Sequence, residues 1–354
     1  MRQKQAMAIL ISVLLSASLG SARAAEDKLD LKLRLKPRQK YSLRIIREDK
    51  ISQTIMGLRQ DIHSTKTTGL GFEVEQVDAN SIASIKVTYL TFKEKTTGVV
   101  GQMEYDSTAP DKAVDYPFAR TYSAMMGQNF VMKVTPGGKI VELKGIDEMF
   151  LRTAGKTIES EDESIRKKLR ERMSEGAEEK AKETIERLNQ RYGSRDKREQ
   201  AVKEMMKKSP ALGEEKIREM VGNVMMPFPD RPVGTGDSWP GRTTLPWGAA
   251  VEIDSTYTLK QKNAAVTVVD VSSKIDLDDE PASMKKGPFG PTKIRMTGSY
   301  QGSFQIDRNS GWMVRKKTTM QCSGEVKTAG NKQKPEGMTM PVSIESVTIV
   351  EPIE

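Results

Sequence analysis

Two strand-like blocks, separated by a long charged stretch with helical periodicity, constrain what this chain can fold into. In residues 29–145, and again in 234–350, apolar and polar side chains alternate with a period of two, which predicts half-buried β-strands. Between them, residues 146–226 are dominated by Glu, Lys, Arg, Met and Ala, which favour helices. The pattern predicts a mainly antiparallel β protein of the α+β class.

The N-terminal block begins with leucine at every second position from Leu29 to Leu35, which predicts a half-buried strand. A hairpin is expected over residues 70–90, with Asp78-Ala79-Asn80 at its tip. A second hairpin is expected over 127–141, because Pro136-Gly137-Gly138 separates two short apolar runs.

The charged middle of the chain predicts three helices. Ser160 followed by Glu163 has the pattern of a capping box and predicts the start of a long helix, which Gly193 ends. Gly176 lies inside this helix, costs about 1 kcal/mol relative to alanine and predicts a kink. Two shorter helices are expected over 195–208 and 213–225.

The C-terminal block again predicts hairpins. One covers residues 253–277 with a turn at Lys262-Asn263, and another covers 300–314. Three prolines and two glycines over 280–292 predict a loop between them. Alternating apolar residues over 342–349 predict the last strand.

The order of elements is the same in both blocks, which we interpret as an internal duplication. The hairpin over 70–90 corresponds to that over 253–277, and the one over 127–141 to that over 302–314. The alternative, that any two antiparallel meanders look similar, stays open at this point. The predicted fold is two similar curved-sheet halves that form an open barrel or sandwich, with a charged helical insertion between them.

The first 24 residues have the pattern of a secretory signal peptide. Arg2 and Lys4 precede an apolar run over 6–19, and Ala22-Arg23-Ala24 is a small-x-small cleavage motif. We therefore expect cleavage near Ala24 and an extracytoplasmic location, periplasmic or secreted, with no transmembrane segment in the mature chain. The expected organisation is a signal peptide over 1–24, an N-terminal β half over 25–150, a helical insertion over 151–226 and a C-terminal β half over 227–354.

The residue content excludes several chemistries. Cys322 is the only cysteine and His63 the only histidine, so an intramolecular disulfide and a multi-histidine metal site are both excluded. The net charge of +9 is diffuse. The sequence has no run of arginines interleaved with aromatics, which is the pattern that would predict nucleic-acid binding. We expect a protein that is not an enzyme and has no cofactor, metal or catalytic residue. The alternative is a hydrolase that uses carboxylates such as Asp237 or Asp254.

Several segments resemble a family of secreted bacterial proteins classed as a domain of unknown function. The resemblance rests on Met103–Ser107, on the hairpin Gly127–Gly138, on Phe228–Trp239 and on a C-terminal strand rich in Thr, Met and Val. The third of these contains a Pro-Val-Gly-x-Gly-Asp-Ser-Trp segment. The resemblance implies an envelope-associated β protein without a known activity. The helical stretch 155–210 is longer and more charged than the family leads us to expect, which marks it as an insertion.

Two functions are consistent with these features. The first is a non-catalytic extracytoplasmic binding or scaffolding protein of the bacterial cell envelope, whose helical insertion contacts a partner. The alternative is a carrier of a hydrophobic ligand, a lipid or lipoprotein, in a cavity of the curved sheet, because few large aromatics are present to fill it. The expected partners are therefore an envelope protein or a lipid. The expected groove is lined by Ile85, Val87, Phe130, Val268 and Phe304.

Overall fold

The computed structural model describes residues 28–353, except for 56, 100, 111–115, 117, 174, 247–249, 279–291 and 329–336. The expected signal peptide over 1–24 lies outside the described residues. So does nearly all of the expected loop over 280–292.

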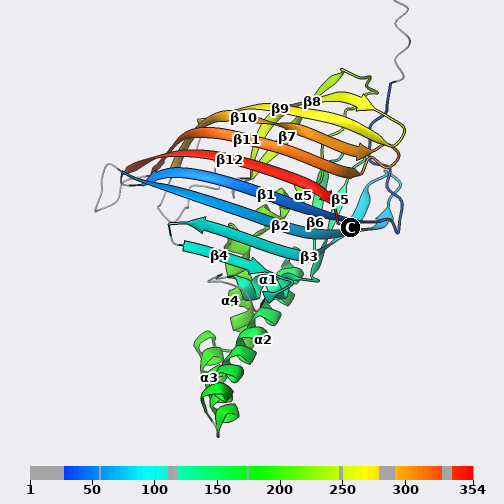
Figure 1. The fold of residues 1–354 in the computed structure, drawn as a ribbon. Helices are drawn as coiled ribbons and strands as arrows, with labels where there is room; N and C mark the ends of the chain where they lie inside the picture. Colours follow the sequence, from blue (N-terminus) through cyan, green and yellow to red (C-terminus); the bar gives the residue numbers. More distant parts are fainter. Residues whose placement is uncertain are drawn as a thin grey trace, which may run out of the picture.

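One antiparallel sheet of twelve strands forms the body of the protein (Figure 1). Its order is β6-β5-β3-β2-β1-β12-β11-β10-β9-β8-β7, and β4 pairs with β3 beside this path. The expectation of a mainly antiparallel β fold is confirmed. The strands are β1 (Lys40–Ile55), β2 (Leu58–Val77), β3 (Ala83–Gly98), β4 (Gly101–Asp106), β5 (Asn129–Val134), β6 (Ile140–Lys144), β7 (Ser238–Pro246), β8 (Ala250–Lys262), β9 (Val266–Leu277), β10 (Thr292–Asp307), β11 (Met313–Thr328) and β12 (Met338–Pro352).

The two strand blocks join where β1 pairs with β12. At this seam Arg47 lies opposite Thr348, and Ile51 lies opposite Ile344. Each block is a meander on its own side of the seam, so the two halves form one continuous open sheet that arches over the helices (Figure 1). The expected pair of curved-sheet halves is therefore observed, joined in one open sheet.

Alternation along the strands gives the sheet a buried inner face and an exposed outer face. In β1, Leu43 and Ile45 are buried, whereas Ser42 and Arg44 are exposed. Because successive side chains of a strand point to opposite faces, the same phase continues through Arg47, Asp49 and Ile51 on the inner face. Helical residues such as Met149 and Phe150 complete the core against this face.

Five helices are described: α1 (Ala119–Met125), α2 (Ile146–Arg172), α3 (Ala177–Tyr192), α4 (Arg195–Lys208) and α5 (Glu214–Gly222). The predicted helix start at Ser160 is wrong, because that residue lies inside α2, which begins after Gly145. The predicted irregularity at Gly176 is a complete break, since the left-handed φ of 69° there separates α2 from α3. The helix over 195–208 is confirmed.

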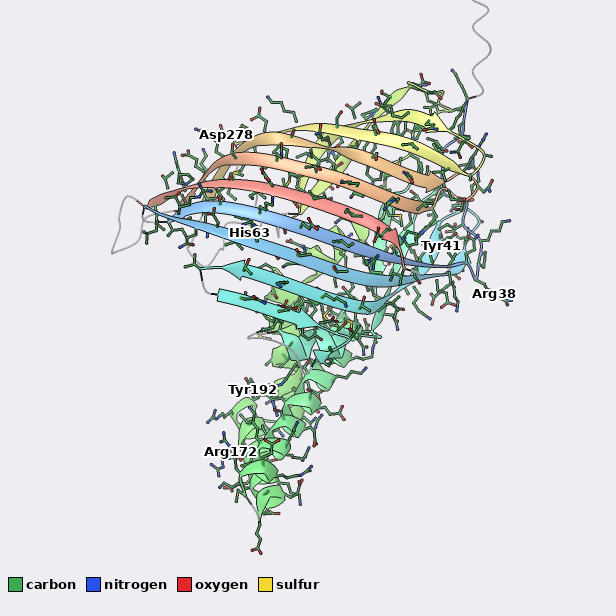
Figure 2. All side chains as sticks on the ribbon, viewed as in Figure 1. Arg38, Tyr41, His63, Arg172, Tyr192 and Asp278 are labelled. Atoms are coloured by element: carbon green, nitrogen blue, oxygen red, sulfur yellow. The ribbon has the colours of Figure 1, made fainter. Side chains whose placement is uncertain are left out.

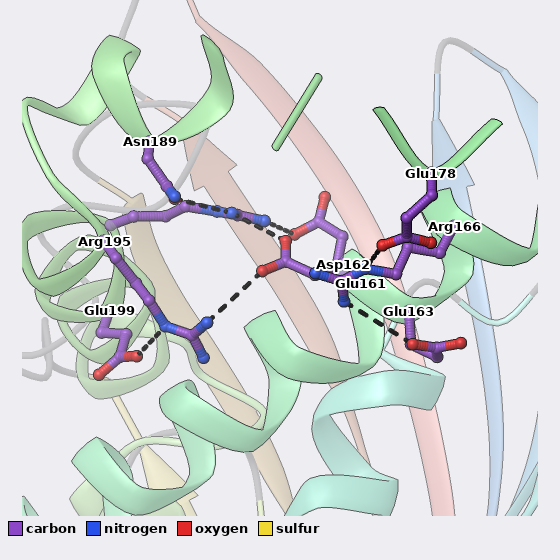
Figure 3. Close-up of polar contacts among 9 residues, drawn as sticks. Glu161, Asp162, Glu163, Arg166, Glu178, Asn189, Arg195 and Glu199 are labelled. Carbon is purple, nitrogen blue, oxygen red and sulfur yellow. Dashed lines mark hydrogen bonds and ion pairs between the residues drawn. The ribbon is translucent and has the colours of Figure 1, made fainter. Parts of the chain in front are cut away.

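Helices α2, α3 and α4 form an arm that extends away from the sheet, with Arg172 and Tyr192 along it (Figures 1 and 2). A buried ion cluster ties the three helices together (Figure 3). Arg198 donates to Asp162 at 3.0 Å and to Glu161 at 2.9 Å, and it also contacts Asn189. The structure of the arm therefore depends on paired charges as well as on apolar packing.

The N-terminal alternation does not produce the expected strand. Leu31, Leu33 and Leu35 are buried as predicted, but the segment makes only one isolated bridge, between Leu29 and Val233. Its backbone donates to the carbonyl oxygens of separate loops, for example from Leu33 to Pro136 at 2.8 Å. The segment is an extended strap across the end of the core.

Candidate ligand-binding cavity

A cavity of about 570 Å³ lies between the inner face of the sheet and the segment 210–223, which contains α5. Its volume is typical of sites that bind small molecules. Strands β1, β2, β3 and β12 supply most of one wall, and α5 supplies the opposite wall. The cavity therefore lies under the seam at which the two halves of the sheet meet.

One part of the cavity wall is aliphatic. Ile51 on β1 has Ile62 of β2 and Ile344 of β12 as its cross-strand neighbours, and all three side chains are half-buried. Side chains directly opposite in antiparallel strands are close enough to pack, so they form a continuous patch. Other apolar side chains extend this patch: Met103, Ile294, Met296, Val326 and Val342.

Charged side chains occupy the next inward positions of the same strands. Arg47 Nε lies 2.8 Å from Asp49, and Lys66 Nζ lies 2.9 Å from Glu94. Helix α5 adds Glu219, which lies 2.7 Å from Lys216 Nζ and 3.5 Å from an Arg47 nitrogen. We call these six residues the charged cluster: Arg47, Asp49, Lys66, Glu94, Lys216 and Glu219.

The carboxylates of the charged cluster also have hydroxyl partners. Ser346 Oγ donates to Asp49 at 2.6 Å, and the Tyr116 hydroxyl donates to Glu94. These bonds satisfy acceptors that would otherwise be costly to bury. Desolvation is the main cause that lowers the pKa of Lys216, opposed by the nearby Glu219 carboxylate.

Lys316 is a buried amine directly behind this site. Only 3% of the residue is exposed, and its Nζ donates to Asn223 Oδ1 at 2.9 Å. The ammonium also lies 5.4 Å from the centre of the Phe304 ring. Burial lowers the pKa of Lys316 to about 7, with a smaller opposing effect from Glu219.

Aromatic side chains close the end of the cavity near α1. Phe92 of β3 and Tyr122 of α1 stack with ring centroids 3.7 Å apart. Tyr116 packs against both Tyr105 and Tyr122. Burial raises the pKa of Tyr122. This wall is therefore uncharged.

The five residues expected to line a groove lie elsewhere. Ile85, Val87, Phe130 and Phe304 are at most 2% exposed and belong to the packed core, whereas Val268 is half-buried on the opposite phase of β9. None of the five lines this cavity. The residues that do line it were missed, although a sequence signal existed: Arg47 and Asp49 interrupt the apolar inward positions Leu43, Ile45 and Ile51 of β1.

The residues considered for other chemistry lie apart from the cavity. His63 is exposed on the outer face of β2 (Figure 2), and Cys322 is buried in β11. The Asp254 side chain is 96% exposed, and Asp237 accepts a hydrogen bond from the backbone of Gly234. Within the described part of the chain, no three potential His, Cys, Asp or Glu ligands are grouped to hold a metal ion. No helix among the described residues is both long and apolar enough to cross a membrane.

Comparison with known proteins gives a family and several distant structural neighbours. The model of a family of unknown function, DUF6263, matches residues 80–192 and 181–313, which together are more than half of the chain. The double match supports an internal repeat. No curated protein sequence matches the chain.

Two of these neighbours have very low sequence identity to this chain. A structure of lipovitellin that describes its lipid–protein interactions is 8% identical, with a TM-score of 0.46, and covers 91% of this chain. This chain spans only 26% of that lipovitellin chain. The β domain of the Bordetella autotransporter BrkA is 7% identical, with a TM-score of 0.21, and covers 88% of this chain and 100% of its own.

Proposed function

Because this chain belongs to DUF6263, a family of unknown function, we propose its function from its own geometry: it is a non-catalytic binding protein for a hydrophobic ligand. The observation that carries the proposal is the cavity of about 570 Å³ between the curved sheet and α5. Its aliphatic wall around Ile51, Ile62 and Ile344 favours an apolar chain, since burying such surface is the main source of ligand affinity.

The cavity has features of a binding site and lacks those of a packed core. Ile51, Ile62 and Ile344 in its wall are half-buried, whereas core residues such as Ile85 and Met132 are completely buried. When a ligand covers apolar surface that was left partly exposed in a concave site, the burial is favourable by about 25 cal/mol per Å². A ligand that covers this wall therefore adds to the stability of the sheet.

Binding is tested with N-phenyl-1-naphthylamine, a neutral apolar dye whose fluorescence rises in a dry site. We expect saturable binding, and we expect Ile344→Trp to weaken it by about tenfold or more, because the indole fills the space of the ligand. Ser343→Trp is the matched control, since Ser343 is the preceding residue and points to the exposed face. Equal binding by both variants, or no saturable binding by the wild type, would contradict the proposal.

We propose that binding takes place outside the cytoplasm, in the bacterial cell envelope. The support is the signal-peptide pattern of residues 1–24. Fusion of residues 1–30 to an alkaline phosphatase that is active only after export tests this. Activity that is lost when the apolar run is interrupted by Leu14→Arg is expected; activity that is unchanged would contradict the location.

A second candidate function, scaffolding, is favoured by the projecting arm of α2–α4. The arm exposes Tyr192, which is 49% accessible, among charged side chains. Replacing 160–199 by a short Gly-Ser linker leaves Met149, Phe150 and Met206 in the core. If the arm binds a protein partner, this variant loses crosslinking to the envelope fraction while it keeps dye binding.

A further inference from the structure

We infer that the ligand of this cavity is an anionic amphiphile, a molecule with one carboxylate- or phosphate-type head and an aliphatic chain. This inference rests on the proposed function and adds the ligand's chemical class. The head would lie against Arg47, Lys66 and Lys216, and the chain along the aliphatic wall.

The first argument is that three cations converge at the cavity. Arg47 of β1 lies directly opposite Lys66 of β2 in the strand register, and both side chains point to the inner face. Like charges in directly opposite positions destabilise a sheet. Lys216 of α5 approaches the same place, and the charges of Arg47 and Lys66 both help to lower the pKa of its ammonium. A bound anion would relieve this repulsion.

The second argument is that the cations are the exposed part of the charged cluster. The side chains of Arg47, Lys66 and Lys216 are 17%, 36% and 28% exposed. Those of their carboxylate partners are only 7%, 9% and 5% exposed. The cluster is balanced in formal charge, but the groups that a ligand in the cavity can reach are mainly cationic.

The third argument concerns hydrogen-bonding capacity. An ammonium has three N–H donors and a guanidinium has five. Among the described residues, the Lys216 ammonium has Glu219 as its hydrogen-bond acceptor, so part of its donor capacity is unused. The carboxylates Asp49 and Glu94 keep their hydroxyl donors, Ser346 and Tyr116, when a ligand takes part of the cations' capacity. An additional anion therefore finds free donors on the cations, while Asp49 and Glu94 each keep a hydroxyl donor.

The position of the cluster next to the aliphatic wall defines an amphiphile. Arg47 and Ile51 are inward-facing residues of the same strand, four positions apart, which corresponds to about 13 Å. Ile62 and Ile344 flank Ile51 on the two neighbouring strands. A ligand along β1 thus meets charge at one end and hydrocarbon at the other.

The experiment measures displacement of N-phenyl-1-naphthylamine from the full mature chain at pH 7.5. Four competitors are used: dodecanoate, dodecyl phosphate, dodecanol and dodecyltrimethylammonium. We expect the two anionic competitors to bind about tenfold more tightly than dodecanol, and the cationic one to bind most weakly. Acetate and inorganic phosphate alone are expected not to displace the dye, because they lack the chain.

The variants test whether the named cations cause this preference. Lys216→Gln and Lys66→Gln should each reduce the preference for dodecanoate over dodecanol by severalfold, whereas Lys216→Arg should keep it. Arg218→Gln is the matched control, because Arg218 is an exposed cation of the same helix that pairs with Glu214.

The outcomes separate this inference from the proposed function. If dodecanol competes as well as dodecanoate and the glutamine variants change nothing, the cavity binds hydrophobic ligands without a head-group site, and only the inference is overturned. If none of the four competitors displaces the dye, both are overturned. Displacement by inorganic phosphate alone, at the same concentration as dodecyl phosphate, would show a simple anion site and also overturn the inference.

Discussion

Replacing Lys316 by methionine should remove a large part of the pH dependence of this protein's stability. The residue is 3% exposed, and among the described residues its amine forms no ion pair with a carboxylate. Its hydrogen-bond partners are the side chain and the carbonyl oxygen of Asn223, at 2.9 and 3.4 Å. Burial without a paired charge lowers the pKa of Lys316 from 10.5 to about 7.

The sign of the effect follows from proton binding. Between pH 7 and 10.5 the folded protein holds Lys316 neutral while the unfolded chain keeps it protonated, so the free energy of unfolding rises with pH in this window. Below pH 7 both states are protonated, and the full cost of burying the charge is present. A pKa shift of this size changes the free energy of unfolding by about 5 kcal/mol in all. About 3 kcal/mol of this change takes place between pH 6.5 and 9.5.

The assay is urea unfolding of the wild type and Lys316→Met at several pH values between 6.5 and 9.5. Groups common to both proteins cancel, so the difference between the two free energies of unfolding isolates Lys316. We expect the free energy of unfolding of the methionine variant to rise relative to that of the wild type as pH falls. Leaving Asn223 without its donor subtracts about 1–3 kcal/mol from the variant's stability at every pH.

Lys317→Met is the matched control, because Lys317 is the next residue and is exposed on the outer face. Its difference from the wild type should not change with pH. Parallel stability curves for the wild type and Lys316→Met would refute the reasoning, since they would mean that Lys316 titrates in the folded protein as it does in the unfolded chain.

Three further predictions concern other parts of the fold. Arg198→Met leaves the buried Asp162 without its closest cation, which should destabilise the arm by about 3–5 kcal/mol and speed hydrogen exchange in α2–α4. Gly138→Ala places a Cβ 2.1 Å from the Met226 carbonyl oxygen at a φ of 79°. The variant should lose more than about 2 kcal/mol of stability, measured as a fall in melting temperature. Cys322, whose pKa burial raises to about 11, should react with Ellman's reagent at pH 8 far more slowly in the folded than in the unfolded protein.

Each of these has a simple control. Arg187→Met removes an exposed pair with Glu183 and should change stability by less than about 0.5 kcal/mol. Gly137→Ala should be tolerated, because its Cβ would meet Thr135 at an ordinary 3.7 Å. Effects equal to those of the controls would contradict the first two predictions, and rapid labelling of folded Cys322 would contradict the third.

Period-two alternation predicted the sheet because it reports a local property, the side of the strand that is buried. It did not predict whether a segment pairs. Leu31 to Leu35 alternate and are buried, yet the backbone donates to Pro136 and Ser310, which lie in separate turns. Burial on one side requires only an extended chain over a core, whereas a strand requires a continuous neighbour.

The helix start at Ser160 failed for a related reason. A capping pattern has meaning only where no helix is already present, and α2 begins at Ile146, after Gly145 in a left-handed conformation. The correct signal was present in the acidic first turn, which contains Asp147 and Glu148. The Ser160 side chain instead lies in the middle of a continuous helix.

The cavity escaped sequence analysis because its position is set by a distant segment. Ile85, Phe130 and Phe304 were expected to line a groove because they are hydrophobic. Strongly hydrophobic inward residues, however, are the ones that are most completely buried in the packed core. The open part of the inner face depends on where α5 lies, more than 150 residues along the chain from β1. A charged residue in the inward phase of a strand, such as Arg47, is the better sequence sign of such a site.

The position of the cavity explains why one strand block alone does not make this site. Its inner wall crosses the seam between β1 and β12, so residues from both ends of the chain, such as Ile51 and Ile344, must meet there. Its outer wall, α5, comes from the helical segment between the blocks, and only α5 brings Lys216 towards the cations of β1 and β2. Pairing the two blocks makes a wide concave sheet, and the helical segment converts part of that surface into a partly open cavity with a charged part and an apolar part. The proposed binding therefore depends on the order of the three segments in the chain, and loosening of α5 should weaken it even when the sheet stays intact.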